Sequence, residues 1–103
     1  MNLRGKQKRF LRAQAHNFHP MFSVGKNGLT TNWLKQLSGA LDNHELIKIN
    51  IQQNSDVETS DVRSFIEDQT DIQVVQIIGR VLVLFKVSQF EDKREISDQV
   101  RAI

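Results

Sequence analysis

The sequence contains no cysteine and no tyrosine, and it has one proline among 103 residues. Without cysteine there is no disulfide, no thiolate nucleophile and no cysteine-ligated zinc, a composition that fits a reducing compartment. No stretch approaches the ~20 apolar residues of a membrane span, and no apolar segment follows the basic start as in a signal peptide. We therefore expect a cytoplasmic protein that does not enter a membrane.

Acidic residues are absent from the first 41 positions, which hold seven lysines or arginines. From Asp42 onward there are twelve acids and seven bases, so regional charges of +7 and −5 give the net charge of +2. A basic N-terminal region of this kind favours an anionic partner, and nucleic acid is the commonest such partner.

The length and composition are typical of one small folded domain, with 39% hydrophobic and 25% charged residues. We place this domain at residues 1–88. Residues 89–103 are charged and have little apolar periodicity, so we expect a C-terminal tail that is either a marginal helix or disordered.

Hydrophobic periodicity predicts three helices and four strands in the order α-β-α-β-α-β-β. Helices are expected over residues 3–16, 30–44 and 55–70, and strands over 21–24, 46–53, 72–78 and 81–87. Gly79-Arg80 is expected to join the last two strands as a two-residue hairpin turn. Thr30, Thr31 or Asn32 can cap the second helix, and Ser55 and Glu58 have the spacing of a capping box for the third. We therefore expect an α/β (α+β) two-layer sandwich, with the helices against one face of a four-stranded sheet.

The segment Gly25-Lys26-Asn27-Gly28 joins the first predicted strand to the second predicted helix. Glycines let the main chain approach a ligand closely, and a helix start offers free N–H groups and a partial positive charge, to which Lys26 adds a full one. The pattern favours a bound phosphate, as in the GxxG loop with which KH domains hold a nucleic-acid backbone. A plain turn without a ligand is the alternative, because this motif alone is weak.

The first predicted helix carries Arg4, Lys8 and Arg12 in one row, at positions i, i+4 and i+8. Like charges at this spacing repel one another, and an anionic partner would relieve the repulsion. The alternative is a solvated helix face. Trp33 falls on the apolar stripe of the second helix, so we expect it to pack in the core rather than to stack on a base.

Catalytic and metal sites find little support in the sequence. His16, His19 and His44 match no known catalytic or metal-ligand spacing, and Gly28 is followed by Leu29 rather than by the lysine of a P-loop. We predict no enzymatic activity, no catalytic residue, no metal and no cofactor.

Four blocks of sequence, in this order, resemble the CRM domain, and in particular its bacterial stand-alone form, the YhbY family. They are Gly5–Arg9 with Ala15-His16, then Val24–Leu29, His44–Ile49 and Val75–Arg80. The resemblance covers about residues 3–86 and implies a fold akin to the C-terminal domain of bacterial translation initiation factor three. It also implies RNA binding through the GxxG loop and the adjoining basic surface. The final strand departs from the family, because Phe85-Lys86 stands where a Tyr-Arg pair is common.

The resemblance further implies association with precursors of the large ribosomal subunit. Together with the basic N-terminal region, it leads us to expect a monomeric protein that binds ribosomal RNA of the large subunit or its precursor, associates with pre-ribosomal particles and assists large-subunit assembly. We expect recognition of RNA shape and backbone more than of base identity. The alternative is a non-enzymatic docking module whose basic N-terminal region binds an acidic protein partner. The expected RNA-binding residues are Gly25, Lys26, Asn27, Gly28, Arg4, Lys6, Lys8, Arg9, Arg12, Lys48 and Arg80.

Overall fold

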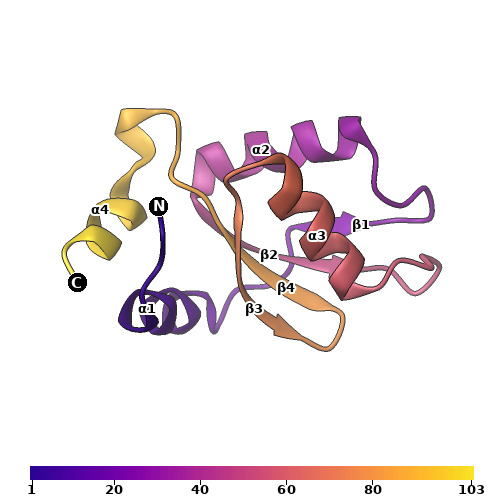
Figure 1. Cartoon of the computed structure of the whole chain (residues 1–103), viewed down its shortest axis with the longest axis horizontal. Coiled ribbons are helices and arrows are strands. Elements are labelled where there is room, and N and C mark those ends of the chain that lie inside the picture. Colours follow the sequence, from indigo (N-terminus) through magenta and orange to yellow (C-terminus); the bar gives the residue numbers. More distant parts are fainter.

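The fold was obtained as a computed structural model, which describes all residues from 1 to 103. Its elements are α1 (Gly5–Ala15), β1 (Phe22–Val24), α2 (Thr31–His44), β2 (Leu46–Ile51), α3 (Thr59–Gln69), β3 (Gln73–Ile78), β4 (Val81–Phe85), the 3₁₀ helix η1 (Glu91–Lys93) and α4 (Glu95–Arg101) (Figure 1). The predicted order α-β-α-β-α-β-β is confirmed, and a short helical segment follows it.

The four strands form one mixed sheet in the order β1-β2-β4-β3. β1 and β2 are parallel, because α2 carries the chain back between them, whereas β2–β4 and β4–β3 are antiparallel. The larger core lies between one face of this sheet and helices α2 and α3, and it includes Leu37, Ile49, Ile66 and Leu84. β3 and β4 are joined by the predicted two-residue turn, in which Gly79 has a φ of +59°.

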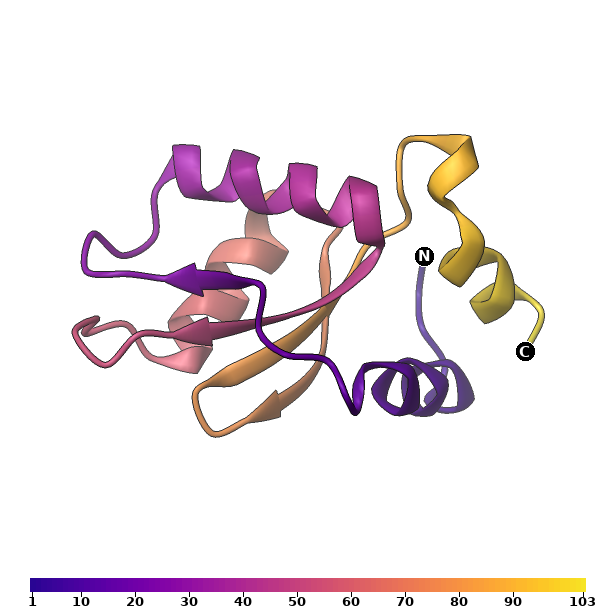
Figure 2. The same cartoon turned by 180° about the vertical axis from the view of Figure 1, so that it is seen from behind.

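The opposite face of the sheet is covered at one end by α1, with α4 packed beside it (Figure 2). Leu11 and Ala15 of α1 pack there against Leu46 and Phe85 of the sheet. The expectation of a two-layer sandwich with helices on one face is therefore wrong at this end. The physical reason is that β2 and β4 carry apolar side chains on both faces there, and the second set needs its own cover.

A β-bulge interrupts the pairing of β3 with β4, and β3 contributes side chains to both cores. The pairing with β4 shifts between Val74 and Gln76, so Val75 is an extra residue in the strand. The adjacent residues Val74 and Val75 point to opposite faces of the sheet, as consecutive strand residues do, and both are buried, the first in the larger core and the second under α1.

The start of the third helix also differs from the prediction. α3 begins at Thr59 with Glu58 as its N-cap, and the Glu58 N–H donates to Asp61 Oδ2 over 3.0 Å. Ser55 instead accepts a hydrogen bond from the Val57 N–H, so it closes a turn before the helix. The capping box predicted from Ser55 and Glu58 is thus wrong, because a second capping pattern lies three residues further on.

For residues 89–103 the sequence left open either a marginal helix or disorder, and the structure shows helix, as η1 and α4. Ser97 and Val100 of α4 are completely buried. The carboxylate of Glu45 accepts hydrogen bonds from the backbone N–H groups of Ser88, at 2.7 Å, and Ser97, at 2.9 Å. These bonds hold residues 88–97 against the junction of α2 and β2.

Candidate nucleic-acid interface

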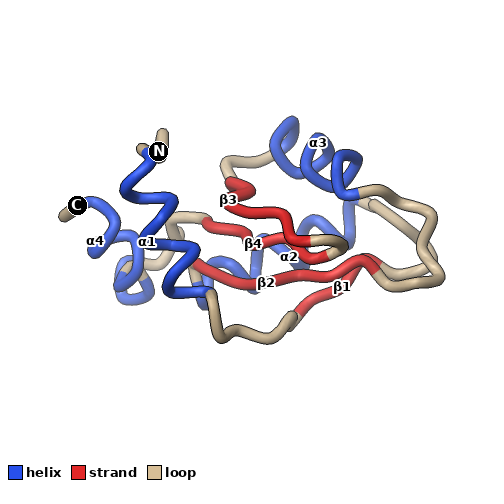
Figure 3. Tube along the Cα trace, turned by 90° about the horizontal axis from the view of Figure 1, so that it is seen from below, coloured by secondary structure: helices blue, strands red, loops and turns tan.

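The GxxG loop connects β1 to α2 at the end of the molecule opposite α1 and α4 (Figure 3). The Gly28 N–H donates to the Gly25 carbonyl over 3.0 Å, which closes a tight turn with Lys26 and Asn27 exposed at its tip. Gly28 has a φ of +70°, a conformation that favours glycine. Gly25 does not have a positive φ. A Cβ at this position would lie 3.3 Å from Gln52 Oε1, so the absence of a side chain lets Gln52 lie close to the loop.

A small polar hollow of about 240 Å³ lies between this loop and the first turns of α2. Thr30 is the N-cap, as one of the predicted alternatives, and its Oγ1 accepts the Trp33 N–H over 3.0 Å. The indole of Trp33 is buried, donates to the Ser23 carbonyl over 2.8 Å and packs near Phe22 and Phe65. The prediction that Trp33 is a packing residue is confirmed.

A larger hollow, of about 690 Å³, lies where α1 leaves the second face of the sheet uncovered. We call it the basic hollow. Its floor is the α1 side of β2 and β3, and its wall is the C-terminal half of α1. The polar and charged residues that line it are Arg9, Arg12, His16, Asn17, Lys48 and Gln76.

The cations around the basic hollow form no ion pair with any acid. The three ion pairs of the protein lie elsewhere, in Lys86–Asp42, Arg63–Glu67 and Arg101–Asp98. Lys48 Nζ donates to the main-chain carbonyl of His16 over 3.1 Å. The positive potential of the hollow is therefore not neutralised within the chain.

Arg80 lies at the same end of the sheet as the GxxG loop. Its guanidinium donates to the main-chain carbonyls of Ile51, Gln52 and Ser55, at 3.3, 2.9 and 3.1 Å. Because the Gln52 N–H also donates to the carbonyl of Val24, the residue before Gly25, Arg80 holds the β3–β4 turn and the β2–α3 loop next to the GxxG loop. These bonds also explain why β2 ends at Ile51 rather than at residue 53.

The remaining predicted residues lie on the N-terminal half of α1. Arg4 is the N-cap of α1, and its guanidinium donates to the carbonyl of Ile103. Lys6 and Lys8 are exposed and do not line the basic hollow. The predicted residues thus occupy three places, which are the GxxG end with Arg80, the basic hollow with Arg9, Arg12 and Lys48, and the start of α1.

Sequence reasoning missed several residues that line the basic hollow. Asn17, Gln76 and Ile78 come from two segments that meet only in the folded chain. No local pattern marks them, and Asn17 could have been singled out only by its place between the basic helix and Pro20. Nowhere do three or more His, Cys, Asp or Glu side chains gather as a metal site would require. None of the helices has the length and apolarity needed to cross a membrane.

The chain is similar in sequence to proteins that are named as RNA-binding. The chain is 43% identical over 94 residues to "Probable RNA-binding protein YqeI" of Bacillus subtilis, a match that covers 91% of this chain and 98% of that protein. It is 40% identical over 85 residues to a Haemophilus influenzae protein named "RNA-binding protein", covering 82% of this chain and 85% of the relative.

A solved structure has the same fold. The solution structure of the hypothetical protein SAV1595 from Staphylococcus aureus matches with a TM-score of 0.71 and 37% identity, over 91% of this chain and 98% of that one. Residues 3–86 match the model of the CRS1 / YhbY (CRM) domain. The predicted family is therefore confirmed, and the chain belongs to the CRS1 / YhbY (CRM) domain family.

Proposed function

We propose that the protein binds structured RNA without catalysing a reaction, and that it does so across the basic hollow and the GxxG loop. The observation that carries this proposal is the set of cations around the uncovered half of the sheet, none of which has an acidic partner. RNA-binding relatives at about two-fifths identity over most of the chain support it.

In this proposal the cations contact phosphates. Arg9, Arg12 and Lys48 hold the backbone across the basic hollow, and Lys26 contacts it at the GxxG end. There Gly28 lets the main chain approach a phosphate as in a KH-type clamp. Arg80 acts mainly by placing the GxxG loop, since its guanidinium already donates to three carbonyls. Phosphate contacts position the protein on RNA without reading its sequence.

The RNA target that we propose is large-subunit ribosomal RNA or its precursor, bound by a monomer in the cytoplasm during assembly of the subunit. This target follows from the resemblance to the bacterial YhbY family, as does the expected likeness of the fold to the C-terminal domain of translation initiation factor three. The family match covers residues 3–86, so we assign the RNA contacts of this proposal to the domain at residues 1–88.

Cross-linking in cells, followed by mapping of the RNA positions, tests the proposed target. We expect cross-links from the basic hollow and the GxxG loop to large-subunit RNA, in fractions that sediment as assembling particles. Cross-links spread over unrelated RNAs would contradict the ribosomal assignment. If Arg9→Glu with Arg12→Glu abolished recruitment to particles but left affinity for bare RNA unchanged, the hollow would bind a protein surface instead.

A further inference from the structure

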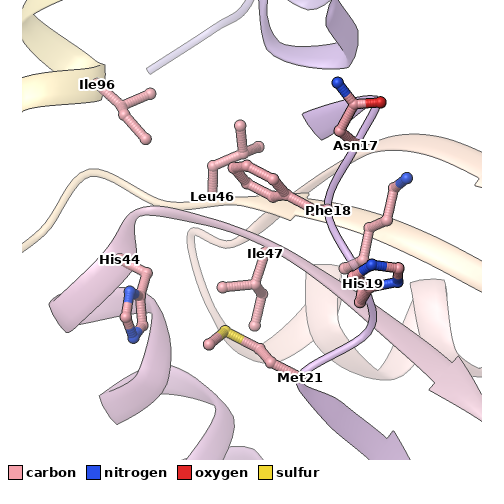
Figure 4. Close-up of a pocket in the computed structure, with 9 residues that line it drawn as sticks. Asn17, Phe18, His19, Met21, His44, Leu46, Ile47 and Ile96 are labelled. Atoms are coloured by element: carbon pink, nitrogen blue, oxygen red, sulfur yellow. The ribbon is translucent and has the colours of Figure 1, made fainter. Parts of the chain in front are cut away.

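A second cleft, of about 500 Å³, adjoins the basic hollow and differs from it in chemistry. We call it the apolar cleft. Its lining comes from three places that are distant in sequence, which are the segment between α1 and β1, the junction of α2 with β2, and α4. Its apolar side chains are Phe18, Met21, Leu46, Ile47 and Ile96. Figure 4 shows Phe18, Leu46 and Ile47 in the middle of the cleft, with His19 and His44 on opposite sides.

Two of these apolar side chains are well exposed, Phe18 by 40% and Met21 by 53%. The main chain that carries them is nevertheless fixed. The Phe18 N–H donates to the Ala15 carbonyl over 2.9 Å, and the Met21 N–H donates to the Lys48 carbonyl over 3.1 Å. Apolar side chains held at the surface by an ordered backbone form a preformed binding surface.

The apolar cleft and the basic hollow lie next to each other, because Asn17 and Lys48 line both. On the basic side stand Arg9, Arg12 and His16, and no acidic residue lines either hollow. A nucleotide has this same division, with a negative phosphate on one side and a flat, largely apolar base on the other. An apolar side chain of a protein partner would also fit the apolar cleft, but it would leave the cations of the basic hollow without an anionic group to bind.

We propose that the apolar cleft holds one unstacked nucleobase of the bound RNA, with the ring of Phe18 against the base and the neighbouring phosphates on Arg9 and Arg12. The proposal rests on the proposed RNA-binding function and deepens it. It adds capture of a bulged or single-stranded nucleotide to backbone binding, as proteins commonly recognise unpaired RNA by stacking on aromatic rings.

Polar groups at the rim of the cleft give it a means of reading the base. The amide of Asn17 and the imidazoles of His19 and His44 carry both donors and acceptors, which suit the hydrogen-bonding edge of a base. Ile96 closes the cleft from α4, so the C-terminal segment supplies one wall of this subsite.

Two RNA duplexes of equal length test the inference, one fully paired and one with a single bulged 2-aminopurine. Their affinities for the full-length protein are measured together with the fluorescence of the bulged base, which changes when the base stacks. We expect the wild type to prefer the bulged duplex. Phe18→Ala should weaken binding of the bulged duplex by about 5- to 100-fold and abolish the fluorescence change, with little effect on the paired duplex.

Phe90→Ala is the matched control, because Phe90 is 48% exposed and lies outside the cleft. Phe18→Tyr keeps an aromatic ring, so it should restore the preference and exclude a merely structural effect. Equal binding of the bulged duplex by wild type and Phe18→Ala, with the paired duplex also bound, would overturn the base subsite while RNA binding stands. Failure of the wild type to bind either duplex would instead contradict the proposed function.

Discussion

Lys48 Nζ donates a hydrogen bond to the main-chain carbonyl of His16 over 3.1 Å, and so ties the middle of β2 to the C-terminal end of α1. A helix carries partial negative charge at this end, which the ammonium offsets. Both residues line the basic hollow. The bond therefore helps to hold α1 where Arg9 and Arg12 face the uncovered part of the sheet.

Replacing Lys48 by Met keeps much of the alkyl chain but removes the charge and this hydrogen bond. We expect a loss of about 0.5–1 kcal/mol in the free energy of unfolding. RNA affinity should fall several-fold, and the slope of its salt dependence should become shallower by about 0.7–0.9. Lys35→Met, at an exposed position of α2 outside the hollows, is the control in the same binding titrations. If Lys48→Met and Lys35→Met changed RNA affinity equally, a place for Lys48 in the RNA interface would be contradicted.

Charge reversal tests whether RNA binding depends on the cations of the basic hollow or on the positive charge of the protein in general. Arg9→Glu with Arg12→Glu should lower RNA affinity by about tenfold or more, because cations that meet phosphates become repulsive. Lys35→Glu with Lys93→Glu makes the same charge change at exposed positions outside the hollow and should have a much smaller effect. Both double variants should melt near the wild-type temperature. Arg4 is left unchanged, because it donates to the Ile103 carbonyl.

The GxxG loop offers a pair of variants that differ in charge alone. Gly28 has a φ of +70°, whereas a Cβ there would meet only Val57 Cγ2, at an ordinary 3.5 Å. Gly28→Asn and Gly28→Asp should therefore both cost about 1 kcal/mol of stability, from backbone strain. The aspartate variant should bind RNA more weakly than the asparagine variant, and also more weakly than Lys26→Ala. Identical RNA affinities for the Asn and Asp variants would show that no phosphate lies at this loop.

The ion pair of Asp42 with Lys86 predicts a pH dependence of stability. Burial would raise the pKa of the Asp42 carboxyl, but hydrogen bonds from Lys86 and Gln89, with the Lys86 charge, outweigh it and lower the pKa. Its ordinary value is 3.8. The stability that this carboxylate contributes is present above the unfolded-state pKa and is lost as pH falls through the lower, folded-state pKa.

Asp42→Asn should lower the free energy of unfolding by about 3 kcal/mol near neutral pH, because Lys86 is left without its counter-charge in a mostly buried place. Urea unfolding between about pH 6 and pH 2 should then show a smaller loss of stability in this variant than in the wild type. Parallel stability curves for the two proteins would contradict the lowered pKa. The Lys86 ammonium lies 2.7 Å from Asp42 Oδ1, so this lysine forms an ion pair within the protein.

A fragment of residues 1–88 tests the division into a domain and a tail. It retains the whole matched family region but lacks the Ser97 N–H that bonds to Glu45, and it uncovers the α1 side of the smaller core. We expect the fragment to keep salt-dependent RNA binding and to melt well below the full chain. Full-length stability in the fragment would mean that α4 contributes nothing to the fold.

Local patterns were sufficient to predict the order of elements and the turn at Gly79, and to limit the cap of α2 to Thr30, Thr31 or Asn32, because each depends on residues close in sequence. The position of α1 on the second face was not predictable. The apolar stripe of α1 could pack on either face of the sheet, and the choice depends on Leu46 and Phe85. In the sequence, Leu46 begins a strand whose alternation indicates one buried face, and Phe85 is part of a continuous apolar run. The packing of the C-terminal helix depends on Glu45 and Ser97, which are 52 residues apart.

The candidate site was predictable to a similar extent. The GxxG loop and the basic first helix are visible as sequence patterns, but their separation at two ends of the sheet is not. The apolar cleft was missed altogether, because Phe18 and Ile96 lie in segments that carry no periodicity and meet only after α4 has folded back beside α1.

The salt dependence of RNA binding tests the central claim most directly. The affinity of the full-length protein for a structured fragment of large-subunit ribosomal RNA is measured over a range of salt concentrations. Neutralisation of about four to six phosphates predicts a slope of roughly −3 to −5 for the logarithm of the association constant against the logarithm of salt concentration. This slope should become shallower in Arg9→Glu with Arg12→Glu. A flat salt response, or no measurable binding at low salt, would contradict the account.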